Sequence, residues 1–378
     1  MRIENEMPIG AVSEPQFSVK GALASLSLSM LLSALGTSKV NIALPILTQT
    51  FNASFQQIQW IVIAYLLAVT ALIVSAGRLG DMTGRRRLLL GGLFIYTASS
   101  LFCGFAPSLQ LLIVGRAIQG LGGTVMMALT LAFVGETVPK EKTGSAMGLL
   151  STMSAVGTAL GPSLGGFLIS SFGWRSIFLF NIPLGVLAFL LSYRYLPVDR
   201  RKPDTQRVGF DNVGTVLLAL ALTAYALAMT IGRGNYSGFN LALLLAAVLG
   251  VALFIYAETK AASPLIRLAV FRNPILSVGF TTSALVSTVL MATLVVGPFY
   301  LTEALGLETA LVGMVICVGP VVVALAGVPA GRLTDKFGNQ HITIIGLCGI
   351  AAGSFLLSLI PVSFGVPGYL FPIVIISA

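Results

Sequence analysis

The chain has 378 residues, of which 56% are hydrophobic and only 9% are charged, against roughly 25% charged residues in an ordinary soluble domain. A soluble core of this length could not hide so much apolar surface, so the composition excludes an ordinary soluble protein. The net charge is +9. The positions of the basic residues along the chain indicate membrane topology, so this charge gives no support for a nucleic-acid partner.

Long stretches without a charged residue divide the chain into predicted helices. Most of these stretches are long enough to cross a membrane once, which takes about 20 apolar residues. The sequence therefore predicts an all-α polytopic membrane protein. The predicted helices span residues 21–47, 58–77, 88–106, 111–135, 144–171, 177–196, 213–231, 239–257, 274–301, 310–331 and 342–361, with a twelfth beginning near 367.

The basic residues indicate the orientation of these helices. If residues 1–20 are cytoplasmic and the helices alternate, 18 of the 22 Lys and Arg residues fall on the cytoplasmic side. Arg175 and Arg233 then fall outside, and Lys39 and Arg116 within the membrane. This bias predicts a multi-pass protein with a cytoplasmic N-terminus.

An internal repeat organises the chain. "GRLGDMTGRRR" begins at Gly77 and "GRLTDKFGNQ" at Gly331, an offset of 331 − 77 = 254 residues. Six helices with their loops need roughly 180–210 residues, so the surplus predicts two inserted helices between two pseudo-repeated bundles. The expected parts are a cytoplasmic tail 1–20, a six-helix bundle 21–196, a cytoplasmic linker 197–211, two inserted helices 212–257 and a C-terminal bundle 258–378.

The two copies of the repeat are followed by unequal lengths of chain. The first half continues for 115 residues after Asp81, to about residue 196, whereas 43 residues follow Asp335. We therefore expect the C-terminal bundle to be incomplete by roughly two and a half helices.

The repeated loop is a candidate conformational element. Glycine permits a tight backbone, and Asp81 can accept hydrogen bonds from a helix N-terminus or pair with an arginine. A purely topogenic loop is the alternative, but the second copy favours a pair of latches on the cytoplasmic face. The predicted residues are Gly77, Asp81, Gly84, Arg85, Arg86, Gly331, Asp335 and Gly338.

Two basic residues lie within predicted helices, where ionisable side chains are costly and usually functional. Arg116 and Gln119 are three residues apart in "GRAIQGLGG" and so share one helix face. Lys39, followed by Asn41 in "SKVNIALP", has no neighbouring carboxylate in sequence. Arg116 either faces a cavity or a partner, or extends its stem to the outer surface. Lys39 either faces the cavity or extends its stem to the outer surface, and these two readings are evenly balanced. We predict Lys39, Asn41, Arg116 and Gln119 as substrate or proton-coupling residues.

A string of small residues, "GTALGPSLGG", occupies the fifth predicted helix. Glycines at every fourth position allow close approach of another helix, and a proline adds a bend point. This string comprises Gly157, Gly161, Pro162, Gly165 and Gly166.

Other features give no sign of an enzyme. Trp174 and Arg175 open the sixth helix as an expected interfacial anchor. Cys103, Cys317 and Cys348 lie in apolar runs and are expected to be small core residues. There is no phosphate-binding loop, and one histidine, His341, gives no basis for a metal site. We expect no enzymatic activity, no cofactor and no metal.

Taken together, these strings resemble the major facilitator superfamily, specifically its fourteen-helix drug:proton antiporter branch, over residues 21–378. The resemblance implies two six-helix bundles with two inserted helices, working by alternating access. It also implies a proton-coupling role for Arg116, a latch role for Asp81 and export by exchange from the glycine–proline string. Many members carry an acidic residue in the first helix where this chain has Gly36, and an apolar residue where it has Lys39.

The expected function is export of small amphiphilic drugs or metabolites across the inner membrane, in exchange for protons. Its partners are then a small molecule, protons and the lipid bilayer, with no nucleic acid, and the protein is expected to be a monomer. Two alternatives stay open: an exporter of anionic substrates that uses Lys39 and Arg116, and a truncated membrane protein that does not transport.

Overall fold

The computed structural model describes residues 18–139, 143–199, 211–231, 238–261, 264, 272–337 and 339–378. In this part of the chain every regular element is a helix, and ten helical spans are long and apolar enough to cross a membrane. The helices are α1 (Val19–Phe51), α2 (Phe55–Thr83), α3 (Arg85–Gly104), α4 (Leu109–Thr137), α5 (Thr143–Phe172), α6 (Ser176–Leu179), α7 (Asn181–Tyr195), α8 (Asn212–Thr230), α9 (Gly238–Lys260), α10 (Pro274–Phe299), η3 (Tyr300–Ala304), α11 (Thr309–Phe337), α12 (Asn339–Leu359), η4 (Val362–Phe364) and α13 (Gly365–Ser377).

Helix ends follow local capping chemistry rather than the ends of the apolar runs. α1 ends at Phe51, and its C-cap Asn52 adopts the left-handed conformation with φ 47°. Ser54 then begins α2 through a capping box with Gln57. α2 continues through the charged motif as far as Thr83 and stops at Gly84, where φ is 100°. The predicted end at residue 77 was therefore too early, because helical backbone continues after the apolar run ends.

Two predicted helices contain irregular segments. The predicted span 177–196 is divided into α6 and α7 at Phe180, whose backbone keeps helical angles, so the two still form one span. The predicted span 274–301 ends in a π-helical turn, η3, just after Pro298. Proline cannot donate its backbone hydrogen bond, which disturbs the regular ladder near this position.

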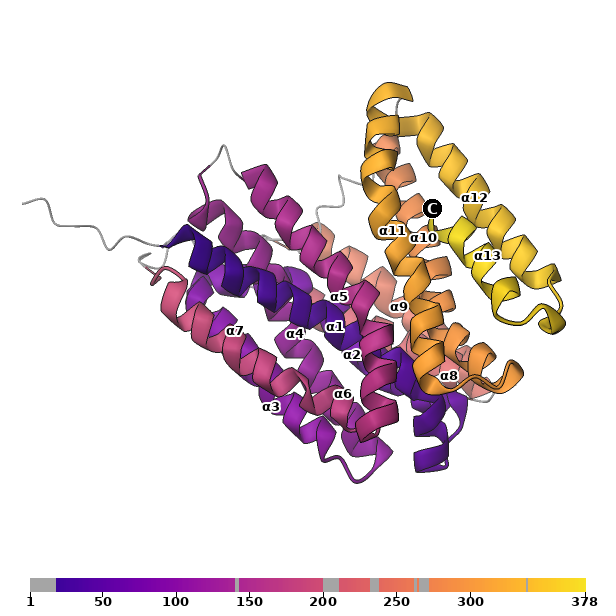
Figure 1. The fold of residues 1–378 in the computed structure, drawn as a ribbon. Helices are drawn as coiled ribbons and strands as arrows, with labels where there is room; N and C mark the ends of the chain where they lie inside the picture. The colour runs from indigo at the N-terminus through magenta and orange to yellow at the C-terminus, as the bar shows by residue number, and fades with distance from the viewer. Residues whose placement is uncertain are drawn as a thin grey trace, which may run out of the picture.

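The helices pack as two groups joined along α5 and α11 (Figure 1). In the first group α1 packs against α5 and α7, and α4 packs against α2 and α3. In the second group α11 and α12 each pack against α13, and α10 contacts α11. Figure 1 shows α5 and α11 side by side at one end of the molecule and diverging toward the other.

The helices α8 and α9 form a pair that packs on the outside of α2. Ser75 of α2 hydrogen-bonds Thr215 of α8 at 2.8 Å, and the Trp60 indole donates to Thr230 Oγ1 at 3.0 Å. Their outward surfaces are apolar, with Leu245 56% and Val248 65% exposed on α9. Large exposed aliphatic side chains on long apolar helices are what lipid contact requires.

The three cysteines differ in burial. Cys103 is buried, as expected for a small core residue, whereas Cys317 is half-buried and Cys348 is exposed. The prediction was wrong for Cys348, because α12 turns that side of the helix away from its neighbours.

Candidate functional site

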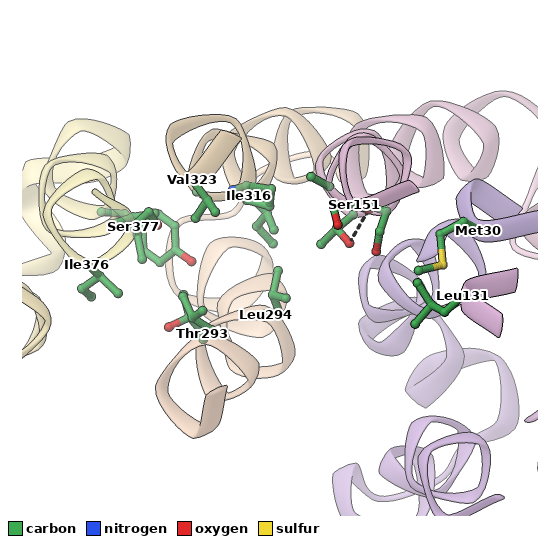
Figure 2. Close-up of a pocket in the computed structure, with 17 residues that line it drawn as sticks. Met30, Leu131, Ser151, Thr293, Leu294, Ile316, Val323, Ile376 and Ser377 are labelled. Carbon is green, nitrogen blue, oxygen red and sulfur yellow. Dashed lines mark hydrogen bonds between the residues drawn. The ribbon is translucent and has the colours of Figure 1, made fainter. Parts of the chain in front are cut away.

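A cavity of about 470 Å³ lies between the two groups of helices. Figure 2 shows Met30 and Leu131 on one side of it, Thr293 and Leu294 on another, and Ile376 and Ser377 opposite the first pair. The lining comes from α1, α4 and α5 and from α10, α11 and α13. The cavity walls are mainly apolar, with scattered hydroxyl groups. Its lining residues are Met30, Leu131, Ser151, Ser154, Ala155, Thr158, Leu290, Thr293, Leu294, Ile316, Gly319, Pro320, Val323, Tyr369, Ile373, Ile376 and Ser377.

A smaller chamber of about 150 Å³ adjoins this cavity and shares part of its wall. The shared residues are Met30, Ser154, Thr158 and Leu294. Asn41 lines this chamber, so one of the four predicted substrate or coupling residues lies at a cavity.

Lys39 is fully buried and does not reach the outer surface of the protein. Its ammonium donates a hydrogen bond to Asn181 Oδ1 of α7 and lies 5.2 Å from the centre of the Phe180 ring. Lys39 is also not among the residues lining the two cavities above. Lys39 therefore does not extend its stem to the outer surface, and its side chain points into the bundle formed by α1, α3, α4 and α7.

Arg116 and Gln119 lie on one face of α4, in contact with each other. Arg116 Nη1 donates to Gln119 Oε1 at 2.5 Å and to Gly36 O of α1 at 3.3 Å, and its Nε donates to Ile61 O of α2 at 3.0 Å. The guanidinium lies 4.3 Å from the centre of the Tyr65 ring, a cation–π contact. Arg116 thus ties together three helices, and like Lys39 it is fully buried.

The two basic residues belong to one hydrogen-bonded network. Gln119 Nε2 donates to Ser100 Oγ of α3 at 2.6 Å, and Asn181 Nδ2 donates to the same oxygen at 3.3 Å. The network therefore runs from Lys39 through Asn181, Ser100 and Gln119 to Arg116. Among the described residues, no carboxylate forms an ion pair with either basic residue.

The sequence analysis missed Asn181 and Ser100. A signal existed for Asn181, which is an amide within the charge-free stretch 176–193, and buried polar groups need partners. Ser100 carried no such signal, because serine is common in membrane helices, where its hydroxyl usually donates to a carbonyl oxygen one turn earlier in the same helix. Here Ser100 Oγ donates to Tyr96 O at 2.7 Å while accepting from both amides.

The first repeat motif forms the junction between α2 and α3. Asp81, 55% exposed, pairs with Arg85 at 2.7 Å, and Arg85 also donates to Ala132 O of α4 at 3.2 Å. Asp199, beyond α7, accepts from the backbone N–H groups of Arg86 and Arg87 at 3.1 and 3.3 Å. The sequence analysis did not identify Asp199, which satisfies the free N–H groups at the start of α3.

Gly77 and Gly84 have different surroundings in this junction. A side chain at Gly77 would meet nothing within 4 Å, so close packing gives no reason for glycine there. Gly84 combines a positive φ with close contact to Asp199, whose Oδ2 would lie 2.5 Å from an added Cβ. Any L-residue at Gly84 would be strained.

The second copy of the motif is only partly described. Gly331 and Asp335 lie in the backbone of α11, but their side-chain surroundings, like Gly338 altogether, lie outside the described residues.

The glycine–proline string of α5 packs on two helices. Added Cβ atoms at Gly157 and Gly165 would lie 2.9 Å from the backbone oxygens of Leu31 and Lys39 on α1, and one at Gly161 would overlap Ser38. Gly166 instead faces α11, where a Cβ would lie 2.7 Å from Thr309 O. Across the same contact, a side chain at Gly313 would overlap the carbonyl oxygen of Pro162. The string therefore allows α5 to touch both helix groups at once.

Trp174 was expected from the sequence to be an interfacial anchor, but its side chain is buried. It is 6% exposed and makes edge-to-face contacts with Phe51 and Phe178 at centroid distances of 5.5 and 6.3 Å. Arg175 lies over its ring at 4.4 Å. The aromatic cluster packs the ends of α1 and α6 together, which buries the indole.

The sequence profile of the Major Facilitator Superfamily matches residues 26–378. The chain belongs to this superfamily. The superfamily assignment agrees with the two groups of helices around a shared cavity and confirms the superfamily resemblance seen in the sequence.

Named relatives include transporters and drug efflux proteins. The riboflavin transporter RibZ of Clostridioides difficile is 34% identical over 357 residues, which cover 91% of this chain and 76% of RibZ. The multidrug resistance protein Stp of Mycobacterium tuberculosis is 31% identical over 321 residues, 84% of this chain and 59% of Stp. The drug efflux pump JefA of the same organism is 34% identical over 306 residues, 80% of this chain and 59% of JefA.

Solved structures support the fold. A D-xylose–proton symporter superposes with a TM-score of 0.66 at 17% identity, covering 95% of this chain and 79% of that protein. A bacterial homologue of the human lysosomal transporter Spinster superposes with a TM-score of 0.63 at 15% identity, covering 97% and 73%. At these identities the likeness concerns the fold alone.

Proposed function

We propose that this protein is a secondary active transporter that exports small amphiphilic compounds across the inner membrane in exchange for protons, by alternating access. The observation that carries the proposal is the mainly apolar cavity of about 470 Å³ between the two helix groups. A cavity of this size and lining suits a drug-sized molecule. Substrate sites between repeated bundles are the expected arrangement in transporters built from repeats.

Relatives support the class of substrate. RibZ is named for riboflavin transport, and Stp and JefA are named for drug resistance or efflux. The chain spans 59% of the length of Stp and of JefA. From the relatives we therefore infer only that the substrate is small and partly aromatic.

The fourteen-helix antiporter branch and the domain division are part of this proposal. The α8–α9 pair packed on α2 supports two helices inserted between a bundle at 21–196 and one at 258–378. The glycine–proline string of α5 supports the assignment of an antiporter motif, because its glycines let both α1 and α11 pack closely against α5. A cytoplasmic N-terminus and a monomeric state complete the proposal.

We assign proton coupling to the buried network of Lys39, Asn181, Ser100, Gln119 and Arg116. Two basic groups without an ion-paired carboxylate among the described residues make a costly arrangement inside a membrane. Lysine can release its proton, whereas arginine stays protonated in proteins. Lys39 is therefore the group we expect to gain and lose a proton, and Arg116 is a fixed positive charge in the same network.

The geometry favours uncharged amphiphiles over anions. An anion exporter based on Lys39 and Arg116 needs those groups at the substrate. In the structure both point into the helix bundle and are bound to Asn181 and Gln119.

The experiment is a flux assay with the purified protein in liposomes that contain a pH-sensitive dye. Neutral, cationic and anionic aromatic compounds are each added under an imposed pH gradient. We expect proton movement with neutral amphiphiles, and its loss in Ser154→Trp, which fills the wall shared by both cavities. Proton movement unaffected by Ser154→Trp would contradict a substrate path through this cavity.

A further inference from the structure

The chamber of about 150 Å³ beside the large cavity has its own lining, which combines polar and apolar side chains. It is bounded by α1, α4, α5 and α10. Its lining residues are Met30, Ser33, Ala34, Thr37, Ser38, Asn41, Met127, Ser154, Thr158, Met291 and Leu294. None of these residues carries a charge, and more than half have a polar or sulfur-containing side chain.

Most hydroxyl hydrogens of the chamber are already used. Thr37 donates to Ser33 O at 3.2 Å, Ser38 donates to Ala34 O at 3.1 Å, and Thr158 donates to Ser154 O at 3.0 Å. A hydroxyl has one hydrogen and two acceptor lone pairs, so these three groups can still accept but can no longer donate. These three groups therefore face a ligand as acceptors, while Asn41 Nδ2 and the hydroxyls of Ser33 and Ser154 can still donate to it.

Two further polar atoms at the chamber lack a partner. Asn41 Oδ1 and Ser33 Oγ are buried, and no described residue hydrogen-bonds to either. Asn41 is 3% and Ser33 2% exposed. Leaving such groups unpaired forfeits the hydrogen bonds that water would have made, so a ligand that supplies a donor gains the compensation.

The charges near the chamber exclude a cation as the best ligand. Arg116 Nη1 donates to Gly36 O, the residue just before Thr37, so the guanidinium approaches this side of α1. Lys39 lies between Ser38 and Asn41 on the same helix. Neither basic side chain lines the chamber, but both add positive potential near it and no carboxylate in the lining offsets this, so a cation is disfavoured. An anion without a hydrogen-bond donor would leave Asn41 Oδ1 unpaired.

Size and sulfur lining point to an aromatic ring. An apolar cavity of about 150 Å³ binds benzene in another protein, so the chamber accommodates one ring. Met30, Met127 and Met291 approach it from α1, α4 and α10. Thioether sulfurs make favourable contacts with aromatic rings and adapt their shape to them.

We propose that this chamber binds the head of the transported molecule, an uncharged aromatic ring bearing an N–H or O–H donor, while the rest of the molecule occupies the large cavity. Asn41 and Ser33 are the specificity-determining residues that accept from the donor. This inference rests on the proposed function, because it names the substrate class for the same cavity.

A matched set of four bicyclic ligands tests the inference. 2-Quinolone is neutral with one N–H, N-methyl-2-quinolone is neutral without it, N-methylquinolinium is a cation and quinoline-2-carboxylate is an anion. Binding of each is measured by equilibrium dialysis with the full chain in lipid nanodiscs, without any gradient. We expect 2-quinolone to bind about tenfold more tightly than the other three, the factor for one hydrogen bond to a buried acceptor.

Two variants locate the effect. Asn41→Leu keeps the side-chain size and removes the acceptor, so 2-quinolone should bind about tenfold more weakly while N-methyl-2-quinolone changes by less than about twofold. Ser170→Ala, which removes an exposed hydroxyl from α5 outside both cavities, should change neither. The comparison of ligands on the unmodified protein decides the matter even if Asn41→Leu does not fold.

Equal binding of the two quinolones, tightest binding of either ion, or no binding of any of the four would overturn the chamber assignment. These outcomes are separate from the transport proposal. If the protein selects 2-quinolone but moves no protons, the chamber assignment stands and proton exchange is refuted. If it exchanges protons without selecting 2-quinolone, proton exchange stands and the chamber assignment is refuted.

Discussion

The contact between α5 and α11 should control which side of the cavity opens, and Gly166→Ala tests this. A Cβ added at Gly166 would lie 2.7 Å from Thr309 O and 3.3 Å from the Cα atoms of Ala310 and Gly313. All three are backbone atoms, which cannot rotate away. Since ordinary Cβ contacts begin at 3.4 Å, the two helices must separate by 3.4 − 2.7 = 0.7 Å along this direction.

The magnitude follows from the cost of overpacking. Adding a methyl group to a tightly packed contact typically costs about 1–3 kcal/mol, and here the cost falls only on the state in which α5 and α11 touch at this point. A bias of that size shifts a two-state population about 5- to 150-fold. Gly166→Ala should therefore favour the state in which these helix ends are apart.

Spin labels on the two helices measure the shift. Ser170 of α5 and Leu311 of α11 are exposed near the contact, and the native Cys103, Cys317 and Cys348 are replaced by alanine in all samples. Double electron–electron resonance should show a longer and more populated distance in Gly166→Ala than in the parent.

The matched control is Gly148→Ala, at the other end of the same helix, where an added Cβ meets nothing within 4 Å. Both variants gain the same helix propensity, about 1 kcal/mol. If Gly166→Ala and Gly148→Ala give the same distance distribution, the α5–α11 contact does not set the opening of the cavity.

Three further predictions concern charged and surface residues. Asn181→Leu should lower the unfolding free energy by about 1.5–3 kcal/mol, because it leaves the buried Lys39 ammonium without its oxygen. Adding Lys39→Met should restore most of this in thermal unfolding, and a double variant as unstable as Asn181→Leu would refute the pairing. Asp81→Asn should change the unfolding free energy by less than about 1 kcal/mol, since its ion pair with Arg85 is exposed. If the loop is a latch, the same substitution should reduce transport at least about tenfold. Full flux in liposomes would mean that the loop only sets the topology. A cysteine at Ser54 should react with an impermeant maleimide in intact cells and one at Arg87 should not, and labelling of both would refute the orientation.

The sequence alone could predict the helices because each apolar stretch ends in charges or turn residues, which are rare within membrane spans. It could not predict that α2 continues to Thr83, since helical backbone carries on past the last apolar residue until Gly84 stops it with a positive φ. Nor could it place the short α6 or the π-helical turn η3, which depend on packing around Phe180 and Pro298.

The types of residue at the site could be predicted from the sequence, but the directions in which their side chains point could not. A lysine and an arginine in apolar helices indicate function, and the spacing of Arg116 and Gln119 correctly placed them on one face. The direction of Lys39 depends on which face of α1 packs on α5. Gly165 sets this face, because an added Cβ there would lie 3.1 Å from Lys39 Cβ. Such a long-range contact leaves no local pattern, so the contact of Lys39 with Asn181 could not be predicted from the sequence.

One measurement tests the central claim most directly, namely that a neutral amphiphile and protons move in opposite directions through this protein. Liposomes containing the protein and a pH-sensitive dye are loaded with 2-quinolone, and its efflux is followed with and without an inward proton gradient. The account predicts that the gradient accelerates efflux, that protons enter as 2-quinolone leaves, and that Lys39→Met abolishes this acceleration while still exchanging labelled for unlabelled 2-quinolone. Efflux at the same rate with and without the gradient, or a gradient effect that persists unchanged in Lys39→Met, would contradict it.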